Sequence, residues 1–274
     1  MRLSRRKFFT RFFLPLTGLI AGDGFWLERY FIQLKEFPLS ESATDDQTLK
    51  IVQISDLHLH QVHRGIRQLL EQIRNLKPDL ILITGDSVDD KDCLPALVEF
   101  LGLLDANTPT FAILGNWEYQ GKVDLTKLSA IYKAHGCELL INQSARIRLK
   151  NKQLCITGTD DWIGGSADFA KAVVGYQPAD FHIVLTHCPG YYDIIRKKYT
   201  QAPYPRIDLV LSGHTHGGQI TLFGFPVVIP RGSGKYVSGW YREEGPPLFV
   251  SRGVGTSVIP FRFFARAEAT VFYI

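Results

Sequence analysis

The chain has 274 residues, which is enough for one large domain with a well-buried core. Its hydrophobic content of 45% and charged content of 21% are ordinary for a globular protein. The formal net charge of +4 comes from residues 1–22, which are basic and hold no acidic residue, so the rest of the chain is close to neutral. The charge balance therefore gives no support for a nucleic-acid-binding surface, and we expect no nucleic-acid partner.

Residues 1–22 resemble a targeting segment. Arg5 and Arg6 precede two phenylalanines, and a short apolar run follows over residues 12–22. This order is typical of export signals, and the arginine pair resembles a twin-arginine signal, which an export receptor reads. The run is shorter than the ~20 residues of a comfortable membrane span. We expect a protein of the bacterial inner membrane or periplasm; the alternatives are a tether that leaves the protein facing the cytoplasm, and a basic tail before a buried helix.

Residues 23–48 are predicted to connect this segment to the main domain. Apolar and charged side chains alternate roughly over residues 26–39, which indicates an edge strand or an amphipathic segment near the membrane. Residues 41–47 are polar and acidic, as in a linker. We expect a single domain over residues 49–274.

Strands and helices alternate in the first half of this domain. Apolar, β-branched runs predict strands at residues 49–55, 80–84 and 110–114. Apolar residues at helical spacing predict helices over residues 66–76, 94–104 and 125–135. Polar residues follow each strand. This is the α/β pattern, in which ligand sites lie outside the carboxyl ends of the strands.

The pattern changes after residue 137. Short alternating runs at residues 137–141, 145–149 and 153–158 predict that an antiparallel part begins there. Two further buried strands are predicted at residues 183–186 and 207–211, and short strands separated by Gly and Pro follow over residues 227–274. The predicted fold is mixed α/β, with a pair of sheets flanked by helices.

Seven side chains with oxygen or nitrogen donors lie at the ends of five predicted strands. They are Asp56, His58, Asp86, Asn116, His187, His214 and His216. Taken singly, each has an ordinary explanation, such as a helix cap for Asp56 or a core position for His187. Taken together, carboxylates and imidazoles suit Mn, Fe or Zn better than Ca or Mg. Seven donors suit two metals ~3.5–4 Å apart that share a carboxylate and a hydroxide, which is phosphoester-hydrolysis chemistry.

The order of these residues resembles the calcineurin-like metallophosphoesterase superfamily over residues 50–220. The matching motifs are Asp56-x-His58, Gly85-Asp86-x-x-Asp89, Gly115-Asn116, His187 and Gly213-His214-x-His216. As a set they are highly specific, although each alone is weak. The resemblance implies a four-layer α-β-β-α sandwich of two mixed sheets that carries a dinuclear metal site.

The resemblance also implies a role for each residue. The ligands of one metal ion would be Asp56, His58, Asp86 and His216, and those of the other Asp86, Asn116, His187 and His214. Asp86 would bridge the ions, and Asp86, Asn116 and His187 would act in catalysis through the bridging hydroxide. We expect two divalent ions, Mn²⁺ ahead of Fe or Zn. Asp89 and Glu118 are candidates for outer partners that orient the ligands.

Further features resemble a bacterial subgroup of small exported or membrane-attached phosphodiesterases. These features are the leader, the extension Gly217-Gly218-Gln219 and residues 251–257. The subgroup includes enzymes that split UDP-2,3-diacylglucosamine in lipid A synthesis. The resemblance implies a small-molecule or lipid phosphoester as substrate and a membrane surface as partner. Such UDP-linked lipids are made on the cytoplasmic face, so an exported protein would instead act on an envelope phosphodiester.

One position departs from the family pattern. The family usually has His and then Asp after the Gly-Asn pair, whereas this chain has Trp117 and Glu118. Trp cannot protonate a leaving group, a step that typically gives ~10²–10⁴-fold. A phosphate-type leaving group needs less help, so the departure favours pyrophosphate or activated diester substrates. Alternatively, His60 or His63 replaces the acid, although both could equally face solvent, or Trp117 binds a substrate ring.

Two functions from different classes remain. The first is a metal-dependent hydrolase of phosphodiester or pyrophosphate bonds, acting on a lipid-linked or envelope substrate. The second is a non-catalytic or weakly active protein that uses the same fold and metals to bind a phosphorylated envelope component. The second rests on Trp117 alone, and the complete set of seven donors favours the first.

Overall fold

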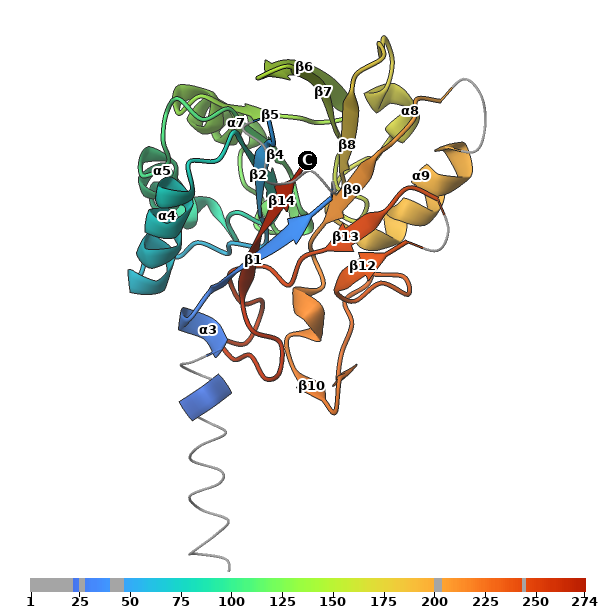
Figure 1. Cartoon of the computed structure of the whole chain (residues 1–274). Helices are drawn as coiled ribbons and strands as arrows, with labels where there is room; N and C mark the ends of the chain where they lie inside the picture. The colour runs from blue at the N-terminus through green and yellow to red at the C-terminus, as the bar shows by residue number, and fades with distance from the viewer. Residues whose placement is uncertain (1–21, 25–27, 40–46, 200–203, 243–244) are drawn as a thin grey trace, which may run out of the picture.

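The computed structural model describes residues 22–24, 28–39, 47–199, 204–242 and 245–274 (Figure 1). The predicted leader lies outside these ranges except for its last residue, and so does nearly all of the predicted linker at residues 41–47. Among the residues that the structure describes, no helix is both long enough and apolar enough to cross a membrane.

Two six-stranded sheets form the centre of the molecule. Across the first sheet the order is β1 (Gln33–Pro38), β14 (Glu268–Tyr273), β2 (Lys50–Ile54), β3 (Leu80–Thr84), β4 (Thr110–Ile113) and β5 (Cys137–Leu139). β2 to β5 run parallel to one another, β14 is antiparallel to β2, and β1 pairs in parallel with β14 at the sheet edge. The first sheet is therefore mixed.

The second sheet is also mixed. Its order is β12 (Gly239–Tyr241), β13 (Leu248–Val250), β9 (Leu209–Ser212), β8 (Phe181–Leu185), β7 (Lys152–Gly158) and β6 (Gln143–Leu149). The four inner strands are parallel, and the two edge strands are antiparallel to their neighbours. A two-stranded hairpin, β10 (Thr221–Leu222) and β11 (Phe225–Pro226), projects beyond this sheet (Figure 1).

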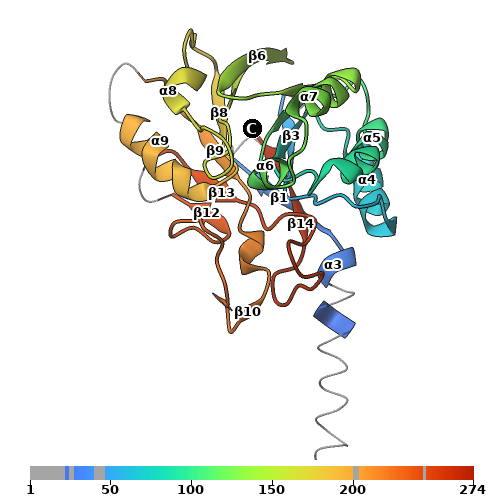
Figure 2. The same ribbon diagram turned by 180° about the vertical axis from the view of Figure 1, so that it is seen from behind.

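Helices cover the outer face of each sheet (Figures 1 and 2). The first sheet carries α4 (Arg64–Leu76), α5 (Leu94–Gly102) and α7 (Leu125–Ala134), and the second carries α8 (Phe169–Ala172) and α9 (Tyr192–Tyr199). Short helices occur as α3 (Glu28–Tyr30), α6 (Asn116–Gln120), η3 (Lys91–Cys93), η4 (Pro189–Tyr191) and η5 (His216–Gly218). The predicted four-layer α-β-β-α sandwich of two mixed sheets is confirmed.

Alternation along the strands explains the layers, because successive side chains of a strand point to opposite faces. On β3, Ile81 and Ile83 pack against α4, α5 and α7, whereas Leu80 and Leu82 lie in the core between the two sheets. On β8, Val184 packs on the side of α8 and α9. Strands that are buried on both faces read as continuous apolar runs, as their sequences do.

The helices and strands predicted over residues 49–135 are confirmed, with ends that differ by at most two residues. The prediction that an antiparallel part begins at residue 137 is wrong. β5 pairs in parallel with β4 as the last strand of the first sheet, because α7 carries the chain back to the start of the sheet and so repeats the strand-helix-strand unit. Antiparallel pairing begins one strand later, between β6 and β7.

Candidate metal centre

The seven predicted donors meet at one edge of the sandwich. Asp56 and His58 follow β2, Asp86 follows β3, and Asn116 begins α6 after β4. From the second sheet, one histidine follows β8 and two follow β9. All seven side chains come from residues that are at most 5% exposed, so their polar atoms contact one another and the surrounding loops rather than bulk water.

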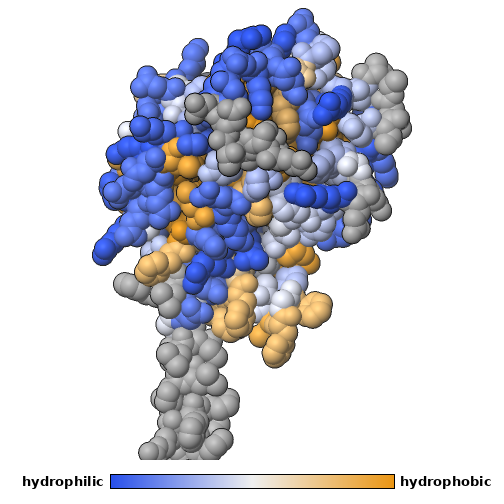
Figure 3. Space-filling view, in the orientation of Figure 1, coloured by the Kyte–Doolittle hydropathy of each residue, from blue (hydrophilic) through white to orange (hydrophobic). Residues whose placement is uncertain are grey.

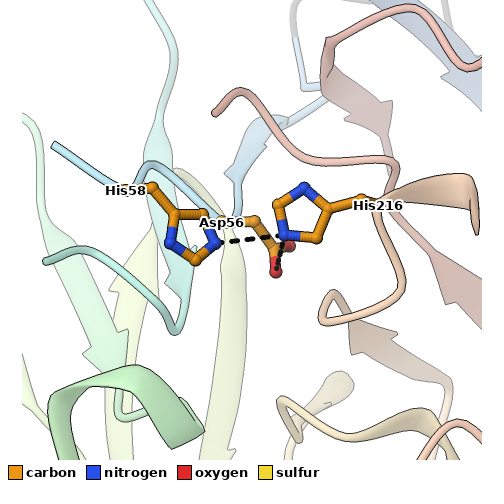
Figure 4. Close-up of side chains that lie close together, drawn as sticks. All are labelled: Asp56, His58 and His216. Carbon is orange, nitrogen blue, oxygen red and sulfur yellow. Dashed lines mark hydrogen bonds and ion pairs between the residues drawn. The ribbon is translucent and has the colours of Figure 1, made fainter. Parts of the chain in front are cut away.

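Asp56, His58 and His216 form the first of two clusters (Figure 4). One ligand atom from each side chain lies within 4.8 Å of the others. The Nε2 atoms of His58 and His216 are 3.0 Å apart, and Nε2 of His216 is 3.5 Å from Oδ1 of Asp56. Both imidazole nitrogens and the carboxylate therefore face the same point.

Asp86, His187 and His214 form the second cluster by the same criterion. Oδ2 of Asp86 lies 3.1 Å from Nε2 of His187, which lies 3.2 Å from Nδ1 of His214. The same Oδ2 atom is 3.7 Å from Nε2 of His58 in the first cluster. Asp86 therefore adjoins both clusters, in the position that a bridging carboxylate would take.

Two buried oxygen atoms support a fit to metal ions. Oδ2 of Asp56 and Oδ1 of Asn116 have no hydrogen-bond partner in the part of the chain that the structure describes. Leaving such atoms unpaired costs ~1–3 kcal/mol each, which a metal–oxygen bond would offset. The 3.0 Å between the facing nitrogens of His58 and His216 also suits two ligands with metal–nitrogen bonds of about 2.0–2.1 Å. The residues present fit a dinuclear metal centre.

Backbone conformation also distinguishes this edge. Five of the seven donors have φ between 44° and 75°, in the left-handed region: Asp56, His58, Asp86, His214 and His216. Residues other than glycine seldom adopt this region, and strained backbone of this kind persists where the surrounding structure holds it, often at functional sites. The loops after β2, β3 and β9 therefore share a conformation that turns their donor side chains into the centre.

Two glycines allow the backbone to enclose Asp56. A Cβ atom on Gly213 would lie 2.3 Å from Oδ2 of Asp56, and one on Gly253 would lie 2.6 Å from Cβ of Asp56. Gly253 also has a φ of +70°. The carboxylate is therefore held between the loop after β9 and the loop after β13.

The charges of the centre are strongly coupled. Burial raises the pKa of Asp56. Burial would also raise the pKa of Asp86, but the facing imidazoles of His187 and His58 outweigh it and lower that pKa. The carboxylates in turn raise the pKa values of His187 and His58, against the effect of burial. Without metal ions, protons on these two histidines would compensate the buried carboxylates, and a metal ion would have to displace them.

Backbone and side-chain acceptors orient the imidazoles. Nδ1 of His58 pairs with Oδ1 of Asp89, while Nδ1 of His187 faces the carbonyl oxygen of Thr84 at 2.8 Å. Nε2 of His214 faces the carbonyl oxygen of Arg231 at 2.8 Å. A metal-binding histidine usually donates its other ring N–H to such an acceptor, which fixes its tautomer and raises its basicity as a ligand.

Glu118 forms hydrogen bonds with the backbone of two loops and with no imidazole in the described part of the chain. Its carboxylate accepts hydrogen bonds from the backbone N–H groups of Ser87 at 2.6 Å and Gly115 at 2.9 Å. It thereby joins the loop that carries Asp86 to the loop that carries Asn116. Burial and the charge of Asp86 raise the pKa of Glu118 to about 7.

A cleft of about 470 Å³ opens over the centre. Four donors line its floor: Asp86, Asn116, His214 and His216. Its walls are mainly apolar and include Trp117, Ile220, Val228, Val258 and Ile259. Apart from the donors, no described residue that lines this cleft has a titratable side chain. The backbone N–H of Trp117 donates to Oδ1 of Asp86 at 2.9 Å, and its ring packs edge-on against His58.

His60 and His63 lie outside this cleft. Nε2 of His60 is 2.9 Å from Oδ2 of Asp89, and the side chain is 65% exposed. It lines a neighbouring cavity of about 500 Å³ that shares Trp117, Val258 and Ile259 with the cleft and is also lined by the donor His58. His63 accepts a hydrogen bond from the N–H of Gly65 as the cap of α4. The structure thus brings neither histidine to the floor of the cleft.

Arg262 was not expected from the sequence. It is fully buried, and its guanidinium donates to the carbonyl oxygens of Arg252, Gly253, Gly255 and Ala265. It also contacts Nδ1 of His216 at 3.3 Å. Burial lowers the pKa of Arg262 to about 10. Its one sequence signal is a lone arginine within the aromatic run of residues 261–264, a pattern that by itself specifies no partner.

Comparisons with known proteins identify similar chains. The sequence model of the family described as calcineurin-like phosphoesterase matches residues 49–218. An uncharacterized metallophosphoesterase of Bacillus subtilis, YkuE, is 32% identical over 99% of this chain and 97% of its own length. One from Aquifex aeolicus is 30% identical over 93% of this chain and 96% of its own. A bovine transmembrane protein with a metallophosphoesterase domain is 31% identical over 86% of this chain and 55% of its own.

Proposed function

The chain belongs to the calcineurin-like phosphoesterase family, and from this premise we propose that it is a two-metal hydrolase of phosphodiester or pyrophosphate bonds. The observation that carries the proposal is the position of Asp86. One carboxylate oxygen lies within 3.1 Å of an imidazole in one cluster and 3.7 Å of an imidazole in the other. A carboxylate shared between two sets of donors can hold two metal ions close enough to clamp the attacking and leaving oxygens of an in-line displacement at phosphorus.

The proposed ligand sets divide along the two clusters. Asp56, His58 and His216 would hold one ion, His187, His214 and Asn116 the other, and Asp86 both. When bound, the two ions supply Lewis-acid stabilisation of phosphoryl oxygens and an activated water at neutral pH. Mixed carboxylate, amide and imidazole donors support Mn²⁺ as the native metal, with Fe or Zn as alternatives.

The cleft lining bears on the choice of substrate. Trp117 stands where the family usually has histidine, and no other titratable side chain joins the donors in the described lining of the cleft. An alkoxide leaving group would therefore depart without a protein acid, at a cost of ~10²–10⁴-fold in rate. We propose that the leaving group is a phosphate or another weakly basic group, as in a pyrophosphate or an activated diester.

The apolar walls support a lipid-linked substrate. Ile220, Val228, Val258 and Ile259 offer no hydrogen-bonding side chain, so they suit an apolar chain or ring next to the phosphoester. Trp117 would contact the group closest to the metals. A nucleoside-diphosphate lipid, as cleaved by UDP-2,3-diacylglucosamine hydrolases, has both parts, and so does an amphiphilic envelope phosphodiester.

We further propose that residues 1–22 direct the protein to the inner membrane or the periplasm through an export receptor. The sequence supports this by its arginine pair and its short apolar run. The bovine relative is described as a transmembrane protein, which is consistent with a role at a membrane. A tether that faces the cytoplasm is the alternative.

A second candidate function is a binder of phosphorylated envelope components that turns over slowly or not at all. Trp117 is the observation that favours it, because it removes the usual proton donor. Turnover that depends on Asp86 separates the two functions.

The test uses the purified chain loaded with Mn²⁺ and three substrates: a nitrophenyl diester, a nucleoside-diphosphate lipid and an alkyl phosphomonoester. We expect cleavage of the first two and little of the third. Asp86→Ala should lower cleavage by more than about 100-fold, since even outer partners of a metal site are worth 10–100-fold. Fast monoester turnover would contradict the leaving-group argument. Binding of two metal ions without turnover of any substrate would favour the binder.

A further inference from the structure

Exposed apolar side chains gather at the end of the molecule that carries α3 and the β10–β11 hairpin (Figures 1 and 3). Nine of the thirteen large apolar side chains that are exposed in the described part of the chain belong to residues 222–229 and 258–264. We define the apolar rim by the residues Leu222, Phe223, Phe225, Val228, Val258 and Phe264. A monomer seldom exposes so concentrated an apolar patch unless the patch has a partner.

The apolar rim is one surface rather than two unrelated loops. The N–H of Thr221 donates to the carbonyl oxygen of Phe263 at 2.9 Å, which joins the hairpin to residues 258–264. The side chain of Gln219 bonds both the carbonyl oxygen and the N–H of Ser257, at 3.0 and 2.8 Å. Val228 and Val258 also line the cleft over the metal centre. The rim therefore borders the mouth of that cleft.

The most exposed members of the rim occupy loop tips. Phe223 is 96% exposed and Val258 is 85% exposed, and both have positive φ, 52° and 62°. A left-handed conformation is strained for a β-branched residue such as valine, and here it holds an apolar side chain out in water. Folding gains nothing from that arrangement. Apolar side chains that project from loop tips suit insertion at the boundary between lipid headgroups and acyl chains.

The charge of the surrounding sequence points to an anionic partner. Residues 219–231 and 252–266 contain no acidic residue and four arginines. Arg262 is buried and Arg252 lies 4.0 Å from the carboxylate of Glu268, whereas Arg231 and Arg266 are exposed. Basic side chains beside apolar ones are attracted to anionic lipid headgroups, at about 1 kcal/mol per charge near the membrane surface.

Residues 24 and 28, near the start of the described chain, contact the segment that carries part of the apolar rim. The carbonyl oxygen of Gly24 accepts a hydrogen bond from the N–H of Arg262 at 3.0 Å. The carboxylate of Glu28 accepts from the N–H groups of Phe264 and Ala265, at 2.9 and 3.0 Å. The basic and apolar residues 1–21 are thus joined to the chain beside the apolar rim, so a leader that reaches a bilayer brings the rim to the same bilayer.

We propose that the apolar rim is a docking surface for an anionic lipid bilayer. Phe223, Phe225 and Val258 insert into the boundary between headgroups and acyl chains, and the cleft opens toward that boundary. For its use in catalysis the inference rests on the proposed function, since a docked cleft would receive amphiphilic phosphoesters directly from the membrane. The docking itself needs neither metal nor turnover.

The test places a tryptophan at the rim of the full-length chain. Phe223→Trp is compared with Val174→Trp, because Val174 is similarly exposed, at 80%, but lies in the loop after α8. Both are mixed with vesicles that contain phosphatidylglycerol and brominated acyl chains, and the emission of the unsubstituted chain is the baseline. We expect quenching at position 223 and none at position 174, and weaker binding to vesicles of phosphatidylcholine alone.

A second pair of variants measures affinity. Phe223→Ser combined with Phe225→Ser should lower partitioning into the anionic vesicles by on the order of 10-fold or more, whereas Val174→Ser should leave it unchanged. Three results would overturn the proposal: vesicle binding without quenching at position 223, quenching at both positions, or a dimer in solution that the double substitution dissociates. The last would make a second copy of the chain the occupant of the rim.

Failure of docking and failure of the proposed function are distinguishable. Asp86→Ala should bind vesicles as the unsubstituted chain does, even though it loses hydrolysis. The double rim variant should still cleave the water-soluble nitrophenyl diester. If the double rim variant lost both vesicle binding and cleavage of the diester, docking and hydrolysis would not be separate roles of these two surfaces.

Discussion

At the scale of single residues, Asp89 is not itself a candidate metal ligand, but it contacts His58, which is one. One carboxylate oxygen pairs with the ring of His58 and the other lies 2.9 Å from His60. The sequence motif marked Asp89 as an outer partner, and the structure gives it a partner on each side. His60 also contacts Sγ of Cys93 through Nδ1, at 3.4 Å, so the chain of contacts runs from His58 through Asp89 and His60 to Cys93.

Substitutions of Asp89 and of His60 should therefore have different effects. Asp89→Asn should weaken Mn²⁺ affinity by about 10–100-fold and leave activity recoverable at high Mn²⁺, because a neutral amide oxygen accepts from Nδ1 of His58 more weakly than the carboxylate and fixes its tautomer less firmly. His60→Ala should change kcat by less than about 10-fold. A loss of ~10²–10⁴-fold with a shifted pH–rate profile would instead identify His60 as the substitute acid. Metal titrations and pH–rate profiles measure both effects.

The pKa values of His58 and His187 predict how pH affects the metal-free protein. Both are raised above the ordinary value of 6.5 by the neighbouring carboxylates, in spite of burial. The stability that the protonated imidazoles contribute is therefore fully present below pH 6.5 and is lost as the pH rises through the raised pKa values. Metal ions compete with the same protons, so they bind more tightly as the pH rises.

We therefore expect Mn²⁺ to raise the Tm of the EDTA-treated protein more at pH 8.5 than at pH 6. Mn²⁺ at 100 times the Kd of one site adds about 2.7 kcal/mol to the free energy of unfolding. This corresponds to a rise in Tm of about 5 °C or more for a chain of this size. Thermal unfolding with and without Mn²⁺ across this range measures the difference. If Mn²⁺ raised the Tm equally at both pH values, or more at pH 6, metal ions would not be competing with protons for these histidines.

At the scale of elements, Arg262 joins several parts of the segment after β13. Arg262 donates to five backbone carbonyl groups, the four named above and that of His216, and keeps the loop that contains Gly253 against Asp56. Arg262→Met keeps much of the volume but leaves these carbonyl groups and the nearby carboxylates without a cation. We expect a loss of about 3–5 kcal/mol in the free energy of unfolding.

The matched control is Arg266→Met, which removes an exposed arginine from the same segment. It should change the free energy of unfolding by no more than about 0.5 kcal/mol. Urea unfolding in EDTA measures both variants without a contribution from metal. Equal effects of the two substitutions would mean that Arg262 acts through net charge rather than through its buried hydrogen bonds.

Local sequence predicted most elements but not all of their partners. Apolar runs and helical spacing located β2 to β4 and the helices between them, because both depend on residues close together in the sequence. The same pattern could not assign β5 to the first sheet, since a short alternating strand reads the same in a parallel and an antiparallel pair. The seven donors were predictable because their positions at strand ends form motifs. Arg262 was not, because its partners lie in other loops.

At the scale of the whole molecule, the export signal that we propose for residues 1–22 makes a prediction of its own. A reporter fused after residue 40 should be exported, and Arg5→Lys combined with Arg6→Lys should block its export, because a receptor reads the arginine pair and not the charge. Arg11→Lys is the control and should export normally. A reporter that stays at the membrane and faces the cytoplasm in all three cases would support the tether.

The division of the donors between the two sheets has one more consequence. Asp56, His58, Asp86 and Asn116 come from the first sheet and the three remaining histidines from the second, and the facing pair of His58 and His216 is separated by 158 residues in the sequence. The complete set of donors therefore cannot form until both halves of the sandwich have docked. A chain that crosses a membrane already folded would carry ions from the compartment of its synthesis, and a chain that crosses unfolded would take those of its destination.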